Sequence, residues 1–128
     1  MIFKQVFDQK SSTYTYLIAS STGREALIID PVLENVEDYI KLLSELDLRL
    51  VKVIDTHIHA DHVTGAGKLR DKTKCVTIMG DHTPADAVEI KVKDEEVIKL
   101  DELNIKALYT PGHTSDSFSF LMDNYLFS

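Results

Sequence analysis

Three histidines and one aspartate lie within six consecutive residues near the middle of the chain: His57, His59, Asp61 and His62. His57 and His59 are two positions apart, so their side chains share one face if the backbone there is extended. Imidazole nitrogens and a carboxylate that converge on one point make a good site for zinc or iron. A polar loop with solvated histidines is the alternative, but the density of ligand-type side chains favours a metal site.

A second motif bears a histidine further along the chain. Pro111 and Gly112 provide a sharp bend that holds His113 just after a predicted strand, the kind of position that His57 also has. Alone this would be an ordinary turn, but beside the first cluster we expect His113 to be a distant partner in the same site. His82, in a predicted loop, is expected to be solvated rather than a ligand.

Three other side chains are expected to have roles outside the metal site's own ligands. Cys75 is the only cysteine, which excludes an intrachain disulfide, and at the start of an apolar run it is expected to be a core thiol. Asp30 precedes Pro31 at a strand end and is expected to cap a turn. Asp55 either orients a ligand histidine or faces the solvent.

Short strands dominate the elements that must position these residues. Runs of β-branched and aromatic residues predict strands at residues 2–7, 13–20, 26–30, 48–56, 75–79, 88–92, 96–100, 105–109, 117–122 and 125–127. Helical spacing of apolar residues predicts helices at residues 36–46, with Asn35 as N-cap, and at 63–70. The order strand, helix, strand across residues 26–56 predicts a parallel βαβ unit, whose sheet would place ligands at the carboxyl ends of its strands.

The bulk composition is that of one ordinary globular domain. Of 128 residues, 44% are hydrophobic and 27% charged, and the formal net charge is −7, which argues against binding to nucleic acid or to an anionic membrane surface. No apolar run approaches the roughly 20 residues that a membrane span needs, and no signal peptide is recognised, so a cytoplasmic location is expected.

The histidine motifs resemble those of a known superfamily. HIHADH at residues 57–62 matches the HxHxDH signature of the metallo-β-lactamase superfamily, and PGHT at 111–114 matches its next ligand motif. THIHADHVTG at 56–65, FKQVF at 3–7 and LIIDPVLE at 27–34 are similar to its persulfide dioxygenase branch. The resemblance covers essentially the whole chain. It implies an α/β fold, with residues 1–128 forming the N-terminal half of an αββα sandwich truncated before its C-terminal half.

The resemblance also implies a ligand set. In persulfide dioxygenases one iron(II) ion is held by residues that correspond to His57 and His113, together with an aspartate that would follow Ser128. Zinc(II) is the alternative metal. The remaining ligand-type residues bind metal in dinuclear zinc relatives such as glyoxalase II and surround the site in the iron branch: His59, Asp61 and His62.

The implied activity is oxidation of glutathione persulfide to sulfite and glutathione, with both oxygen atoms of O₂ passing to sulfur. A glyoxalase II-like hydrolase, in which two zinc ions activate a water that attacks a thioester, is the first alternative. The second is a catalytically silent module that associates with another copy through an exposed half-sandwich, and a homo-oligomer is expected. The sequence does not decide whether the metal is iron or zinc, nor which thiol carries the persulfide.

Overall fold

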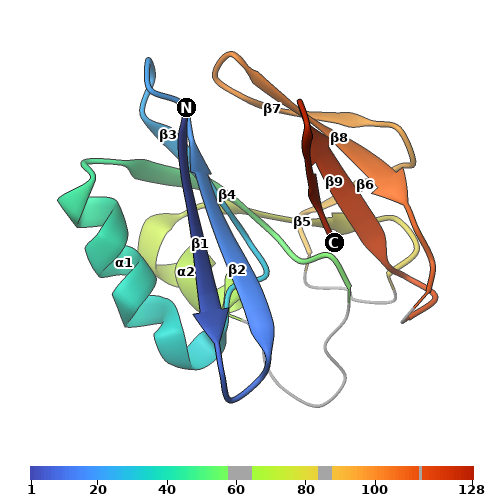
Figure 1. The fold of residues 1–128 in the computed structure, drawn as a ribbon, viewed down its shortest axis with the longest axis horizontal. Coiled ribbons are helices and arrows are strands. Elements are labelled where there is room, and N and C mark those ends of the chain that lie inside the picture. Colours follow the sequence, from blue (N-terminus) through green and yellow to red (C-terminus); the bar gives the residue numbers. More distant parts are fainter. Residues whose placement is uncertain (58–64, 84–87, 113) are drawn as a thin grey trace.

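Two β-sheets lie face to face in the computed structural model, which describes residues 1–57, 65–83, 88–112 and 114–128 (Figure 1). The elements are β1 (Ile2–Asp8), β2 (Thr13–Ala19), β3 (Glu25–Ile29), a 3₁₀ turn (Leu33–Asn35), α1 (Val36–Glu45), β4 (Arg49–Ile54), α2 (Ala66–Thr73), β5 (Val76–Gly80), β6 (Ile90–Val92), β7 (Val97–Leu100), β8 (Leu103–Tyr109), β9 (Phe118–Met122) and β10 (Tyr125–Phe127). The predicted strands are therefore confirmed, with ends that differ by a few residues. None of the described helices is long and apolar enough to cross a membrane.

The larger sheet has the order β1-β2-β3-β4-β5-β6. β1, β2 and β3 pair antiparallel, whereas β3, β4, β5 and β6 run parallel. β3, α1 and β4 form the predicted parallel βαβ unit, because parallel neighbours need a crossover that a helix can supply. The carboxyl ends of β3, β4 and β5 consequently meet at one edge of the sheet, where the histidine segment begins.

The smaller sheet is antiparallel, in the order β10-β9-β8-β7. β7 and β8 form the hairpin predicted around residues 101 and 102, with Leu100 opposite Leu103. β8 and β9 are joined by the segment that contains the second histidine motif. The segment between β8 and β9 therefore belongs to the smaller sheet, whereas the first histidine motif follows a strand of the larger sheet.

Apolar side chains form two core layers. Alternate residues of β3 point in opposite directions: Leu27 and Ile29 pack between the sheets, and Ala26 and Ile28 pack toward the helices. α1 and α2 both cover that second face of the larger sheet (Figure 1). A strand buried on both faces has a continuous apolar run rather than alternation, which is why β3 was readily predicted.

The ends of the two helices differ in part from those predicted from the sequence. The side chain of Asn35, the predicted N-cap, makes no capping hydrogen bond to α1, and its Nδ2 instead donates to Asp8 Oδ1 at 3.1 Å. α2 ends later than predicted, at Thr73, where Lys74 adopts a left-handed φ of 63°. That conformation is a common way to terminate a helix.

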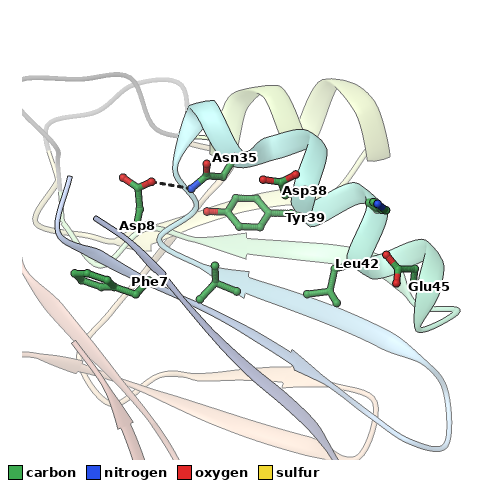
Figure 2. A pocket seen from close by; sticks show the side chains of 9 residues that line it. Phe7, Asp8, Asn35, Asp38, Tyr39, Leu42 and Glu45 are labelled. Atoms are coloured by element: carbon green, nitrogen blue, oxygen red, sulfur yellow. Dashed lines mark hydrogen bonds between the residues drawn. The ribbon is translucent and has the colours of Figure 1, made fainter. Parts of the chain in front are cut away.

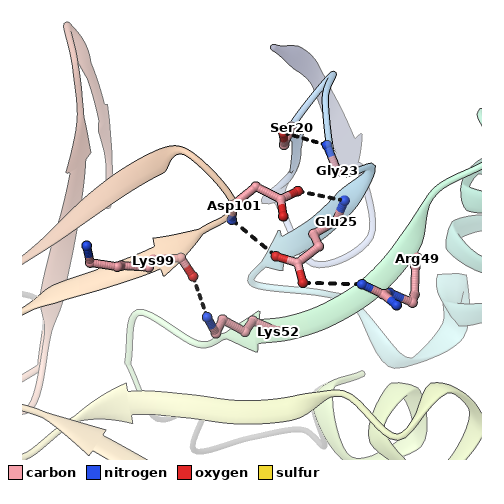
Figure 3. A network of polar contacts seen from close by, with 7 residues as sticks. All are labelled: Ser20, Gly23, Glu25, Arg49, Lys52, Lys99 and Asp101. Atoms are coloured by element: carbon pink, nitrogen blue, oxygen red, sulfur yellow. Dashed lines mark hydrogen bonds and ion pairs between the residues drawn. The ribbon is translucent and has the colours of Figure 1, made fainter.

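Two contacts set how the sheets approach each other. Near the histidine motifs, Gly80 of β5 packs against the Phe118 ring, and a Cβ at residue 80 would overlap with that ring. At the opposite end, Asp101 and Glu25 each donate a backbone N–H to the other's carboxylate, at 3.1 and 3.2 Å (Figure 3). Lys52 Nζ donates to the Lys99 carbonyl across the same junction. The layers are therefore tied together at both ends.

Candidate metal centre

His57 lies directly after β4, at the edge where the parallel strands end, and its side chain is half-buried. The preceding residue, Thr56, is buried, and its carbonyl accepts a hydrogen bond from the Phe118 N–H at 2.8 Å. Phe118 is the first residue of β9, in the other sheet. The backbone at the first histidine is therefore joined directly to the strand that follows the second histidine motif.

Asp30 holds Thr56 in place from the end of the neighbouring strand β3. Its carboxylate accepts the Thr56 backbone N–H at 2.7 Å and the Thr56 hydroxyl at 2.8 Å. The Asp30 backbone has a left-handed φ of 54°, a conformation that aspartate tolerates better than most residues. The expectation that Asp30 caps a turn stays a prediction, and its carboxylate is hydrogen-bonded to the residue before His57, a role that the sequence did not suggest.

These bonds determine which imidazole nitrogen of His57 carries the proton. Thr56 Oγ1 lies 2.9 Å from His57 Nδ1 and has only one proton, which it donates to Asp30. The hydroxyl must therefore accept from His57, so Nδ1 is protonated and Nε2 has the lone pair that a metal ion requires. A histidine oriented in this way by its other nitrogen is the usual arrangement at protein metal sites, and His57 fits that role.

A second set of hydrogen bonds fixes the backbone around Asp30. The Val32 N–H donates to the Tyr39 hydroxyl at 3.0 Å, and that hydroxyl lies 3.1 Å from Thr15 Oγ1. Thr15 in turn donates to the Asp30 carbonyl at 2.7 Å. Because Thr15 uses its proton there, Tyr39 must donate to Thr15. β2, α1 and the end of β3 thus jointly fix the backbone at Asp30.

Two residues that flank the second motif, Thr110 and Ser117, lie beside His57. The Thr110 N–H donates to the Ser117 carbonyl at 3.1 Å and closes a turn between β8 and β9. A pocket of about 290 Å³ lies between this turn and the end of β4. It is lined by Thr56, His57, Thr110, Ser117, Phe118 and Ser128. The expectation that both motifs meet at one place is consistent with this arrangement.

The other predicted ligands, His59, Asp61, His62 and His113, lie outside the described residues. Within residues 1–57, 65–83, 88–112 and 114–128, no group of three or more His, Cys, Asp or Glu side chains could hold a metal ion. The ligand set predicted from the sequence therefore stays a prediction, with His57 as its described member.

Several weaker expectations can be compared with the structure. Asp55 is buried, so the solvent-facing alternative for its side chain is wrong. Cys75 is buried as predicted, and desolvation raises the pKa of its thiol. His82 is partly exposed, but its ring stacks on Tyr109, a contact that the sequence did not suggest. The positioning roles of Asp30 and Thr56 were also missed, and their only sequence signal is a polar residue at the end of a buried strand.

A larger hollow, of about 460 Å³, lies between β1 and α1 and contains Asp8, Asp38, Glu45 and Lys41 (Figure 2). The pKa of Asp8 is lowered, chiefly by hydrogen bonds from Ser11 and further by the bond from Asn35. Three carboxylates against one ammonium group make this hollow unfavourable for an anionic ligand. The pocket at His57 contains no Asp or Glu side chain among its lining residues and therefore lacks this excess of negative charge.

Comparison with known proteins gives consistent matches. Residues 9–127 match the model of the metallo-beta-lactamase superfamily. The chain is 36% identical over 126 residues to the mitochondrial persulfide dioxygenase ETHE1 of Bos taurus, covering 98% of this chain and 49% of that protein. It is also 36% identical over 109 residues to a probable hydroxyacylglutathione hydrolase of Schizosaccharomyces pombe, covering 84% of this chain and 42% of that protein.

Among solved structures, ETHE1 from Myxococcus xanthus matches with a TM-score of 0.93 at 44% identity, over 98% of this chain and 56% of that one. This match confirms the α/β fold that the sequence resemblance implied. The chain spans about half the length of the curated relatives that it matches.

Proposed function

The chain belongs to the metallo-β-lactamase superfamily, and from this membership we propose that its parent protein is a persulfide dioxygenase. The observation that carries the proposal is the match to persulfide dioxygenases, which extends over nearly the whole chain and includes the surroundings of both histidine motifs. The matched hydroxyacylglutathione hydrolase covers less of the chain. The proposed reaction oxidises a thiol persulfide to sulfite and the free thiol: O₂ is the oxidant and supplies two oxygen atoms, water supplies the third, and two protons are released.

The proposed metal is a single iron(II) ion, which would supply the redox chemistry that O₂ requires. His57 would bind it through Nε2, because the hydrogen bonds from Asp30 through Thr56 place the imidazole proton on Nδ1. His113 and a carboxylate beyond Ser128 would complete the set of two histidines and one carboxylate typical of such iron sites. His59, Asp61 and His62 would surround the site or, in the zinc alternative, bind metal themselves.

Glutathione persulfide is the proposed substrate. The hydroxyl groups of Thr110 and Ser117 line the pocket at His57 and could donate hydrogen bonds to an anionic thiol compound, whereas the Thr56 hydroxyl already gives its proton to Asp30. The name of the hydrolase relative refers to a glutathione derivative as well, which supports glutathione as the carrier.

An O₂-uptake assay tests the dioxygenase proposal. The protein, extended past Ser128 to the length of its relatives, is loaded anaerobically with iron(II) and mixed with glutathione persulfide. We expect O₂ consumption with matching release of sulfite, and metal analysis giving about one iron per chain. The His57→Ala variant is the control and should be inactive. Absence of uptake by the iron-loaded protein would refute the proposal.

A zinc-dependent glutathione thioester hydrolase is the second candidate, favoured by the match to the hydroxyacylglutathione hydrolase. In that case two zinc ions per chain would activate a water molecule as the nucleophile. Hydrolysis of a glutathione thioester by the zinc-loaded protein, with no O₂ uptake by the iron-loaded one, would select this alternative.

Self-association is proposed as well. Val97 and Leu126 are exposed on the smaller sheet, with exposed fractions of 47% and 58%, and such apolar surface favours contact between copies. Sedimentation of the 128-residue chain measures this directly, and a concentration-independent monomer would contradict it.

A cytoplasmic location stays a prediction, since the bovine relative is named as mitochondrial.

A further inference from the structure

Tyr109 is the last residue of β8 and immediately precedes the turn at residues 110–117, which contains the second histidine motif. Its phenolic hydroxyl donates to the Ser115 carbonyl at 2.8 Å, on the far side of that turn. Its backbone N–H donates to Asp94 Oδ1 at 2.8 Å. A side chain at the start of the turn therefore holds the other end of the same turn.

The turn has further hydrogen bonds, which Tyr109 supplements. The Gly112 N–H donates to the Thr114 carbonyl at 3.2 Å, and the hydroxyls of Thr114 and Ser117 lie 2.6 Å apart. These bonds are short-range: Pro111, Gly112 and Ser115 are exposed and Thr114 is half-buried, although Asp116 is buried. Exposed hydrogen bonds compete with water, so an additional bond from a fixed side chain matters for the order of such a turn.

The Tyr109 ring is itself fixed by two aromatic neighbours from other elements. It stacks on His82, with ring centroids 3.7 Å apart and an interplanar angle of 5°, and it packs obliquely against Phe118 at 5.4 Å. His82 comes from the loop after β5, where its Nε2 lies 3.8 Å from Asp81 Oδ1. Stacked and tilted arrangements of this kind are the favoured geometries of aromatic pairs, so both contacts restrict the Tyr109 ring.

Phe118 connects this group to the first histidine. Its ring packs against Gly80 and lines the pocket at His57, and its N–H donates to the Thr56 carbonyl. His82 also lies near Phe118, with ring centroids 6.0 Å apart, so His82, Tyr109 and Phe118 form one cluster of three rings between the loop after β5 and the start of β9. Phe118 thereby places this group of rings beside His57, the predicted ligand that the structure describes.

We propose that Tyr109 and His82 are positioning residues that hold the turn at residues 110–117 against the end of β4. They would do so without binding the metal themselves: Tyr109 holds the turn through its hydroxyl, and His82 fixes the Tyr109 ring by stacking. The inference rests on the proposed metal site, since its consequence is that the two histidine motifs keep a constant separation. Residues that orient metal ligands indirectly commonly change metal affinity by 10–100-fold when they are removed.

Two variants separate the two contributions. Tyr109→Phe removes the hydroxyl and keeps the ring, whereas His82→Ala removes the stacking partner and keeps the hydroxyl. In the metal-free 128-residue chain, we expect both to accelerate amide hydrogen exchange at Gly112 and Ser117. In the protein extended past Ser128 to the length of its relatives, we expect both variants to weaken cobalt(II) affinity by on the order of tenfold. We also expect both to alter the cobalt(II) absorption bands.

Matched controls keep a general loss of stability from imitating this result. Tyr14→Phe makes the same change at an exposed tyrosine of β2 and should leave exchange and affinity unchanged. His82→Phe restores a ring that can stack on Tyr109 and should recover most of both properties.

Unchanged exchange in Tyr109→Phe and His82→Ala would overturn the inference, and so would faster exchange with unchanged cobalt(II) affinity. Failure of His82→Phe to recover would exclude the stacking role. If the unmodified protein binds no metal, the proposed function fails instead, while the exchange measurement still decides whether Tyr109 and His82 hold the turn.

Discussion

At the scale of single residues, the arrangement of Asp30, Thr56 and His57 decides how the candidate site can act. One hydroxyl proton, given by Thr56 to Asp30, forces the imidazole proton of His57 onto Nδ1. Of these three residues, Asp30 is the one whose backbone has a left-handed φ. The chemistry of the site therefore depends on two residues that are not predicted ligands.

Replacing Asp30 with asparagine should reverse this order of protons. The amide group cannot accept both Thr56 donors, so the Thr56 hydroxyl would turn, donate to His57 Nδ1 and leave the imidazole proton on Nε2. We expect metal affinity to fall by about 10–100-fold and stability by about 1–3 kcal/mol. Competition with a chromophoric chelator measures the first, and ¹⁵N NMR of the imidazole identifies the tautomer. Asp38→Asn, on the exposed face of α1, is the control, and an unchanged Nδ1–H tautomer in Asp30→Asn would contradict the prediction.

At the scale of elements, the site depends on how closely two separately formed sheets approach. β4 brings His57 and β9 brings Phe118, and the bond between Phe118 and Thr56 joins them. The close packing of Gly80 on Phe118 and the polar contacts around Glu25 and Asp101 hold the sheets at opposite ends (Figure 3). Changes at either end should therefore alter the stability of the whole sandwich.

Gly80→Ala should destabilise the protein by about 1–3 kcal/mol, because its methyl group would overlap with the Phe118 ring and force the sheets apart. Urea denaturation followed by circular dichroism measures this change. Gly67→Ala in α2 is a matched control, since a Cβ there meets no atom within 4 Å. Alanine favours helix over glycine, so the control should gain up to about 1 kcal/mol. Equal effects of the two substitutions would refute this account.

Glu102 should make the junction between the sheets sensitive to acid. Its carboxylate accepts hydrogen bonds from Ser20 at 2.6 Å and Thr22 at 2.7 Å, and these bonds lower its pKa from the usual 4.5. A lowered pKa in the folded state gives stability that is present above pH 4.5 and is lost as the pH falls through the folded-state value.

The midpoint of urea denaturation, measured at several pH values from about 7 down to about 3, tests this dependence, because carboxylates titrate at the acidic end of that range. Glu102→Gln should be less stable than the unmodified chain at neutral pH and should lose less stability on acidification. Glu45→Gln, an exposed carboxylate in α1, should leave the slope nearly unchanged. If the stability of Glu102→Gln fell with decreasing pH as steeply as that of the unmodified chain, the prediction would be contradicted.

At the scale of the whole molecule, the described residues form two sheets and two α-helices, and the chain spans about half the length of its curated relatives. Both described helices cover the larger sheet, on the face away from the smaller sheet (Figure 1). The smaller sheet exposes Val97 and Leu126 on its other side. Metal binding and self-association are therefore the two events most able to add stability to this chain.

Metal binding should raise the stability of the folded protein by mass action. At a free metal concentration of 100 times Kd, the gain is about 2.7 kcal/mol, equivalent to an increase in Tm on the order of 10 °C. Differential scanning calorimetry with and without cobalt(II) or zinc(II) measures it, and a chelator should reverse it. In His57→Ala the increase should be absent, and an equal increase in that variant would show that the metal binds elsewhere.

Local patterns in the sequence were sufficient to predict most elements and the ligand types. β-branched runs and helical spacing are properties of neighbouring residues, so the βαβ unit, the β7–β8 hairpin and the buried Cys75 could be predicted. The histidine spacing likewise indicated metal chemistry, because the types of ligand are visible in the sequence alone.

Only the tertiary structure decided which distant residues act together with His57. Asp30 reaches Thr56 because β3 and β4 are parallel neighbours, and His82 reaches Tyr109 because the two sheets face each other. Asn35 is the N-cap of α1 as predicted, but its side chain makes no capping bond and instead donates to Asp8 of a distant strand, a contact that only the fold provides. Such contacts depend on register and on packing between layers, which no local pattern contains. The first histidine of the cluster was therefore predictable, whereas the position of its proton was not.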